Sequence, residues 1–202
     1  MLIKHNSPQI TVSAPQEKFP FSQLEGGFSR GSLGVLCGPQ GSGKSEIAIR
    51  FLAENASLQA AWVEDELSIY PHAFSQNGVA LERVLFIEAG LKDSLWCVHQ
   101  LLRSGLFQVV IYTLAPARSR RGKKIPLEED EVSLRRLQIA AEKSGALVLF
   151  LAETPFAASW PLYSQIQVFR NFQSHTTTTQ THVPVLTVLK HRGQRACPIK
   201  AV

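Results

Sequence analysis

The fold is decided by the stretch Gly38-Pro39-Gln40-Gly41-Ser42-Gly43-Lys44-Ser45. This stretch is a complete GxxxxGK[ST] motif. The apolar run 33–37 precedes the motif, and the segment 45–56 after it places its apolar residues at helical spacing. A glycine-rich loop between a buried strand and a helix is the setting that a phosphate-binding loop, or P-loop, needs. The sequence therefore predicts a strand, a P-loop and a helix in succession.

Each residue type in this loop suits a bound polyphosphate. The glycines allow the backbone to wrap around the phosphates with its N–H groups pointing inward, and the start of the helix adds a partial positive charge. Lys44 is expected to reach the β and γ phosphates, and Ser45 to coordinate Mg²⁺ through its hydroxyl group. We therefore expect ATP and Mg²⁺ as the ligands of residues 38–45.

Apolar strands and amphipathic helices alternate along the rest of the chain. Strands are predicted over 60–63, 84–87, 107–112 and 146–151, and helices over 71–76, 93–103 and 130–143. This alternation indicates an α/β fold with a mainly parallel, twisted sheet covered by helices on both faces. The runs 165–168 and 183–189 are expected to pair as an antiparallel C-terminal hairpin. We interpret residues 1–20 as an extended N-terminal arm and 21–202 as a single nucleotide-binding domain.

The composition excludes several classes of protein. Of 202 residues, 45% are hydrophobic and 18% are charged, which is the balance of a compact globular chain and excludes disorder throughout. Apolar runs such as 146–152 are far shorter than the roughly 20 residues that span a bilayer, so we expect no membrane contact and a cytoplasmic location. Cys37, Cys97 and Cys197 are interpreted as reduced thiols, with Cys37 in the core.

Positive charge gathers in two places. Residues 154–202 hold five Lys and Arg and no Asp or Glu, a balance that favours polyanionic partners such as nucleic acid. A basic loop lies at 118–124, and single-stranded DNA is its candidate ligand. An ordinary solvated surface loop is an equally good interpretation of that charge run. The candidate DNA-binding residues of this loop are Arg118, Arg120, Arg121, Lys123 and Lys124.

The ends of two predicted strands bear on hydrolysis. P-loop ATPases carry an aspartate at the end of a later strand to orient Mg²⁺, but the strand near Val109 ends here in Thr113. We therefore expect weak metal binding and slow ATP turnover, if any. Three carboxylates follow the strand 60–63, and Glu66 is our candidate for the base that activates water, with Lys44 as its catalytic partner. A helix-capping or surface role for these acids stays open.

Four segments together resemble the ATP-binding core of the RecA recombinases. They are 26–32, the P-loop, 62–66 and 101–105, and the resemblance extends over about residues 22–200. It implies that Glu66 activates water, that Thr113 replaces the Walker B aspartate, and that Glu153 replaces the glutamine that senses the γ-phosphate. It also implies that Lys190 and Arg192 reach across an interface between copies onto a neighbour's nucleotide, which makes a homo-oligomer a candidate assembly. A nucleic-acid or surface contact is an equally good interpretation of these two residues.

The segments 133–141 and 188–193 resemble the ImuA family of short RecA-related proteins more closely. This resemblance implies an accessory protein of DNA damage tolerance and translesion synthesis, with error-prone polymerase subunits or RecA as partners. The nucleotide would then act as a conformational or assembly switch. Two alternatives stay open: an active DNA-dependent ATPase or minimal recombinase, and, more weakly, a RecA-fold inhibitor of cell division.

Overall fold

The computed structural model describes residues 18–90, 92–114, 131–157, 161–170, 184–192 and 198–199. Its central feature is an eight-stranded sheet with the strand order β10-β9-β8-β3-β7-β6-β4-β5. The strands of this sheet are β3 (Leu33–Cys37), β4 (Ala60–Glu64), β5 (Val84–Glu88), β6 (Val109–Thr113), β7 (Leu147–Ala152), β8 (Ser164–Arg170), β9 (Pro184–His191) and β10 (Pro198–Ile199). The helices are α1 (Lys44–Glu54), α2 (His72–Gln76), the short 3₁₀ turn η1 (Leu81–Arg83), α3 (Ser94–Ser104) and α5 (Glu131–Ser144).

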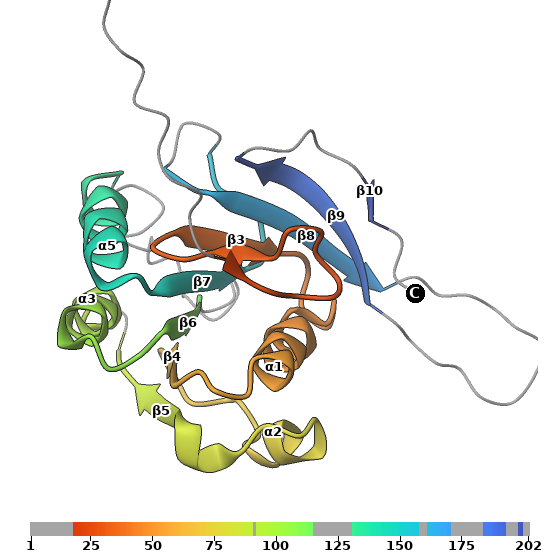
Figure 1. The fold of residues 1–202 in the computed structure, drawn as a ribbon, viewed down its shortest axis with the longest axis horizontal. Helices are drawn as coiled ribbons and strands as arrows, with labels where there is room; N and C mark the ends of the chain where they lie inside the picture. The colour runs from red at the N-terminus through yellow and green to blue at the C-terminus, as the bar shows by residue number, and fades with distance from the viewer. Residues whose placement is uncertain are drawn as a thin grey trace, which may run out of the picture.

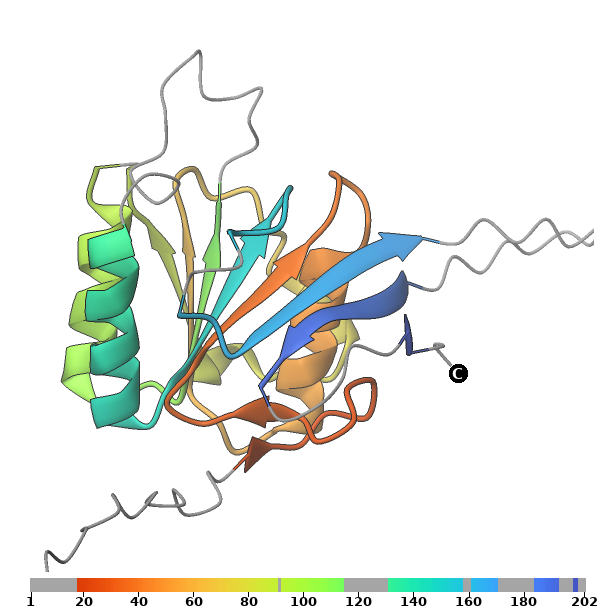
Figure 2. The same cartoon turned by 90° about the horizontal axis from the view of Figure 1, so that it is seen from above.

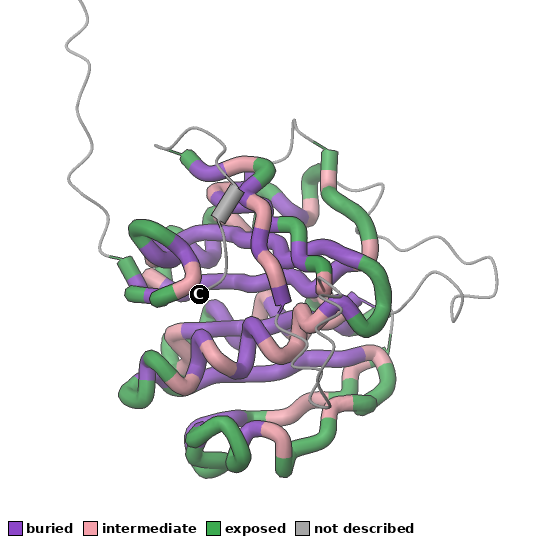
Figure 3. The backbone as a smooth tube through the Cα atoms, turned by 90° about the vertical axis from the view of Figure 1, so that its right-hand side faces the viewer, coloured by how far each residue is buried: buried purple, intermediate pink, exposed green. Residues whose placement is uncertain are grey.

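Helices cover both faces of the sheet, as the alternating pattern predicted. Figures 1 and 2 show α3 and α5 side by side on one face and α1 on the opposite face. The central strands β3, β4 and β7 are buried along their whole length, and Figure 3 shows them in purple between half-buried helices. Two apolar clusters, one on each face, therefore hold the sheet in place. None of the helices in the described ranges is long and apolar enough to cross a membrane.

The C-terminal strands confirm the predicted hairpin and add its position. β8 runs parallel to β3, and β9 runs antiparallel to β8 with Arg170 opposite Pro184 and Gln165 opposite Lys190. Because β8 is the direct neighbour of β3, the carboxyl end of β8 lies beside the loop that follows β3. The sequence pattern predicted the pairing of the two strands but not this placement. The predicted hairpin tip, 175–180, lies outside the described residues.

Two short strands near the N-terminus were not predicted. β1 (Lys18–Phe19) pairs with β2 (Phe28–Ser29) as a small antiparallel ribbon, so residues 18 and 19 of the expected arm form a strand. Two aromatic rings pack against Phe51 on the inner face of α1. The ring centroids are 5.9 Å apart for Phe21 and Phe28, and 5.0 Å apart for Phe28 and Phe51. Phe19 contacts Phe51 edge to face at 6.3 Å. This aromatic cluster fixes the inner face of α1 against the ribbon.

A buried arginine binds the C-terminal end of α1. The Arg83 guanidinium donates to the carbonyl oxygens of Leu52, Asn55 and Leu58 at 2.5, 3.1 and 3.0 Å. The last carbonyls of a helix have no acceptor role within it, so they need donors of this kind. Burial lowers the pKa of Arg83, which shows that the cation is held at some cost. The helix that carries the P-loop lysine is thus packed along its face and satisfied at its end.

Candidate functional site

The P-loop lies where the sequence predicted it, between the end of β3 and the start of α1. Gly43 is the N-cap residue of α1 with a φ of 99°, a conformation that favours glycine, and α1 has no side-chain cap. Position 38 has no room for a side chain, since a Cβ atom at Gly38 would lie 2.1 Å from the carbonyl oxygen of Val168 in β8. The first amides of α1 therefore remain available to an anion from outside the helix.

Lys44 folds back onto its own loop. Its Nζ donates to the carbonyl oxygens of Gly38 at 2.5 Å and Pro39 at 2.8 Å. Burial lowers the pKa of Lys44, while the Glu153 carboxylate acts in the opposite direction. Because burial disfavours the charge on this ammonium group, an anionic ligand beside it would stabilise the charged form. Cys37 lies just before the loop, fully buried, and burial raises the pKa of its thiol to about 11, as expected for a core cysteine.

A cavity of about 370 Å³ opens beside this loop, a volume typical of a small-ligand site. It lies at the carboxyl ends of β3, β6, β7 and β8, the edge at which open parallel sheets bind ligands. The residues that line it are Gln40, Gly41, Gly43, Lys44, Ser45, Glu46, Ser68, Thr113, Leu114, Leu151, Ala152, Glu153 and Arg170. Most of the predicted loop 38–45 therefore borders one hollow.

Thr113, singled out at a strand end, and Glu153, singled out by the resemblance to the RecA recombinases, line the same cavity. The Thr113 hydroxyl is buried and has no hydrogen-bond partner among the described residues, so it is available to a ligand. Hydroxyl and carboxylate oxygens, such as those of Ser45 and Glu153, are the ligand types that Mg²⁺ prefers. The described residues contain no cluster of three or more acids, histidines or cysteines, so an ion here needs phosphate oxygens and water to complete its shell.

The structure separates the three carboxylates at the end of β4, of which Glu64 is the last residue of the strand. Glu64 is buried and accepts bonds from Trp62 Nε1 at 2.9 Å and from the amides of Ser68 and Ile69 at 2.6 and 3.0 Å. These bonds shape the turn that brings Ser68 to the cavity. Asp65 is near the Tyr112 hydroxyl, 3.4 Å away, whereas Glu66 is exposed and is not among the described residues that line the cavity. A base role for Glu66 stays a prediction.

Sequence reasoning missed one ion pair at this site. Glu46 accepts from Arg50 at 2.7 Å and from Arg170 at 3.2 Å, and both Glu46 and Arg170 line the cavity. Arg170 was counted only as part of the C-terminal positive charge, because nothing in the sequence placed the end of β8 beside the P-loop. Its proximity follows from the pairing of β8 with β3.

Lys190 and Arg192 lie away from the cavity of their own chain. Lys190 is opposite Gln165, at the start of β8, while the cavity lies at the end of β8. Six residues of extended chain separate Lys190 from Pro184, or about 20 Å. Burial lowers the pKa of Lys190, and the charge of Arg192 nearby lowers it further. A contact between these two cations and a nucleotide would therefore involve the cavity of another copy.

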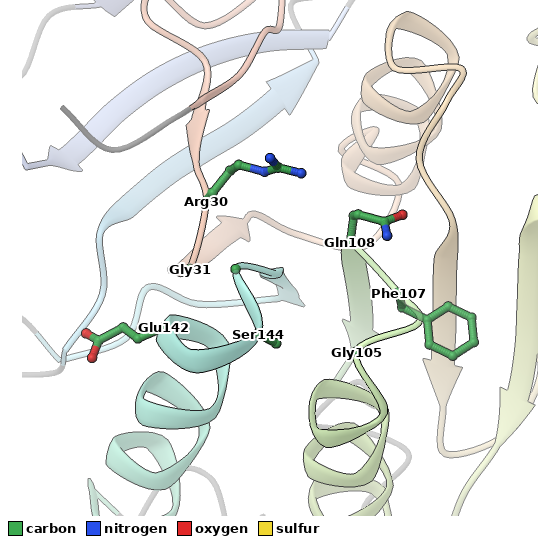
Figure 4. A pocket seen from close by; sticks show the side chains of 8 residues that line it. Arg30, Gly31, Gly105, Phe107, Gln108, Glu142 and Ser144 are labelled. Atoms are coloured by element: carbon green, nitrogen blue, oxygen red, sulfur yellow. The ribbon is translucent and has the colours of Figure 1, made fainter. Parts of the chain in front are cut away.

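Two other candidate regions give less support for a functional site. The predicted DNA-binding residues at 118–124 lie outside the described residues. A second hollow of about 470 Å³ lies at the amino ends of the strands, between the ends of α3 and α5 (Figure 4). Arg30, Gln108 and Glu142 contribute side chains to it (Figure 4). It is on the opposite edge of the sheet from the P-loop, and open parallel sheets bind ligands at the carboxyl ends of their strands, so we place the functional site at the P-loop edge.

Comparisons with known proteins agree with this fold. No protein-family model matches the chain. It is 30% identical over 141 residues to the protein RecA of Rippkaea orientalis, covering 63% of this chain and 40% of that protein. It is 28% identical over 139 residues to RecA of Bacillus subtilis, covering 62% of this chain and 40% of that protein. The chain thus spans about 40% of the length of these curated relatives.

The crystal structure of the RadB recombinase resembles this structure with a TM-score of 0.68 and 18% sequence identity, covering 87% of this chain and 88% of that chain. This likeness confirms the predicted fold, a RecA-like α/β core with a C-terminal antiparallel hairpin. The closer likeness to ImuA stays a prediction. The chain therefore has a RecA-like fold and is similar in sequence to part of the bacterial RecA proteins.

Proposed function

We propose that this chain binds ATP with Mg²⁺ in the cavity beside the P-loop. The observation that carries the proposal is the combination of Lys44, half-buried at the cavity wall, with the start of α1, which has no side-chain cap. Lys44 then exchanges the carbonyls of Gly38 and Pro39 for phosphate oxygens. Ser45 and Thr113 offer hydroxyl oxygens toward the ion.

We further propose that the nucleotide acts as a switch and is hydrolysed slowly or not at all. Thr113 supplies no charge at the strand end where P-loop ATPases have an aspartate. The candidate base, Glu66, is exposed to solvent in this structure. A site that holds a triphosphate without a well-placed base favours binding over turnover. Bound ATP then biases the shape or assembly of the protein.

The biological role that fits these features is that of a RecA-related accessory protein in DNA damage tolerance, similar to ImuA. Its partners would be error-prone polymerase subunits or RecA, with single-stranded DNA as a further ligand of the loop 118–124. The similarity to RecA proteins over 63% of the chain supports a partner in this group. A pull-down that returned only proteins of other processes would contradict the role without touching the nucleotide site.

Nucleotide binding is tested with a Lys44→Ala variant and a fluorescent ATP analogue. We expect at least about tenfold weaker binding, because one charge-assisted contact to phosphate is lost. Lys143 near the end of α5 is exposed and distant from the cavity, so Lys143→Ala is the matched control and should bind as the parent does. Equal affinity of the parent and Lys44→Ala would refute the proposal.

An active DNA-dependent ATPase is the second candidate, favoured by Glu153 at the cavity opposite Lys44. Phosphate release measured with and without single-stranded DNA separates the two. Strong stimulation by DNA that disappears in Glu66→Gln would favour the enzyme. A low rate that neither DNA nor Glu66→Gln changes would favour the switch.

A further inference from the structure

Arg170 occupies a position that the proposed nucleotide site leaves unexplained. It ends β8, the strand beside β3, and its side chain lines the cavity together with Lys44 and Ser45. A Cβ atom added at Gly43 would lie 3.7 Å from Arg170 Nε, so the guanidinium sits against the first turn of α1. Arg170 and Lys44 are the cations that line this cavity within the described part of the chain.

The guanidinium is only partly engaged. Its Nη2 contacts Glu46 at 3.2 Å, while its Nε is buried without a hydrogen-bond partner among the described residues. A guanidinium has five N–H donors in a planar fork that matches phosphate oxygens. Part of this donor capacity is therefore unused at a residue that lines the cavity.

Glu46 can release Arg170 without becoming unpaired. It lies one residue beyond Ser45 and also contacts Arg50 at 2.7 Å, on the same helix. Two carboxylates, those of Glu46 and Glu153, line a cavity that would receive the negative charge of a triphosphate. Such a ligand repels both carboxylates and attracts the Arg170 cation. Arg170 is thus placed to change partner when the ligand enters.

We propose that Arg170 binds the polyphosphate of the nucleotide held by its own chain, exchanging Glu46 for phosphate oxygens. This inference rests on the proposed ATP binding and adds a second cation from the C-terminal hairpin to the P-loop lysine. Because Arg170 pairs with Pro184 across the hairpin, the exchange couples the cavity to the strands that carry Lys190. Under this proposal, nucleotide binding therefore affects the hairpin directly.

A cycle of four proteins tests the contact: the parent, Arg170→Ala, Glu46→Gln and the double variant. Affinity is measured with a fluorescent ATP analogue and by its displacement with inorganic tripolyphosphate, which isolates the phosphate contact. In the Glu46→Gln background, Arg170→Ala should weaken both ligands about tenfold, and Arg170→Lys should weaken them less. If Arg170 serves only to neutralise Glu46, its removal will have no effect in that background, and the proposal is overturned.

The matched control is Arg50→Ala in the Glu46→Gln background, since Arg50 is the other partner of Glu46 and does not line the cavity. Its affinity should match that of Glu46→Gln alone, and an equal loss for Arg50→Ala would overturn the assignment. Thermal unfolding of each variant verifies that it is folded. If the parent and Lys44→Ala bind alike, ATP binding itself fails, whereas a normal Lys44 effect with silent Arg170 variants refutes only this inference.

Discussion

Thr113 ends β6 with a neutral hydroxyl at the cavity, and its Oγ1 atom is buried with no partner among the described residues. A hydroxyl can orient a water molecule of a hydrated Mg²⁺ but cannot offset the charge of the ion. Compared with an aspartate at this position, Thr113 offers the proposed Mg²⁺ one negative charge fewer. That deficit can be repaired by a single substitution.

We expect Thr113→Asp to raise Mg²⁺-dependent phosphate release and the affinity for the Mg²⁺–ATP complex by about tenfold, the effect of one charge-assisted contact. The measurement is a coupled phosphate-release assay over a series of Mg²⁺ concentrations. Thr113→Asn has the same shape without the charge and serves as the control. Parallel behaviour of the two variants would show that charge at this position is not what limits turnover.

At the level of elements, α1 depends on a residue that is distant from it in the sequence. Arg83 in η1 donates to the carbonyl groups of Leu52 and Asn55 at the end of α1 and to that of Leu58 just beyond it, and Arg83 itself is buried. Loss of this cation leaves several polar groups buried without partners. The effect should reach the P-loop, because α1 carries Lys44 at its first position.

Arg83→Met should therefore lower the free energy of unfolding by about 2 to 4 kcal/mol, measured by urea denaturation. Arg103→Met is the control, since Arg103 is exposed near the end of α3, and it should change stability by less than about 0.5 kcal/mol. The prediction would be wrong if both substitutions shifted the urea midpoint equally.

Elements with strong periodicity were the ones that the sequence could predict. The run Leu33–Cys37 is fully buried, and the helix that ends near Gly105 does so with that glycine at a φ of 67°. The two-residue strands β1, β2 and β10 were missed, because so short a pairing leaves no period in the sequence. Ile139, an apolar residue of the predicted helix 130–143, is 44% exposed, because α5 packs through the narrower stripe formed by Leu134, Leu137, Ala140 and Ala141.

At the site, the sequence could predict the features that depend on neighbouring residues, but not those that depend on contacts between distant segments. The expected roles of residues 38–45 follow from a continuous motif, that of Thr113 from its place at a predicted strand end, and that of Glu153 only from the resemblance to the RecA recombinases. The pair formed by Glu46 and Arg170 joins residues 124 positions apart, so it depends on the order of strands in the sheet. Glu64 looked equivalent to Glu66 in the sequence, yet its Oε2 accepts from the turn at Ser68 and its Oε1 accepts from Trp62.

For the whole molecule, the distance between the cavity and the far end of β9 decides how copies could cooperate. Lys190 and Arg192 lie too far from the P-loop of their own chain to contact its ligand. If a second copy docks with its cavity against this end of the sheet, the two cations lie at the interface. Assembly then depends on the nucleotide, as the resemblance to recombinases implies.

Replacing both residues, Lys190→Ala with Arg192→Ala, should abolish ATP-dependent assembly in sedimentation experiments and leave the affinity of dilute protein for the ATP analogue unchanged. Mixing this variant with Lys44→Ala should restore a single type of interface, because one copy supplies the nucleotide and the other the cations. Arg136→Ala, an exposed substitution on α5, is the control. Assembly that survives the double substitution would remove these two residues from the interface.

The aromatic cluster behind α1 has a practical implication for anyone who trims this chain. Phe19 and Phe21 come from the first described residues, but they pack on Phe51 in the helix that begins at the P-loop lysine. A shortened protein starting after residue 21 would lose two of the rings that wedge this helix in place. We expect such a protein to bind ligand poorly because α1 has lost its packing, and not because a ligand contact has been removed. An inactive truncation is therefore no proof that the removed residues touch the ligand.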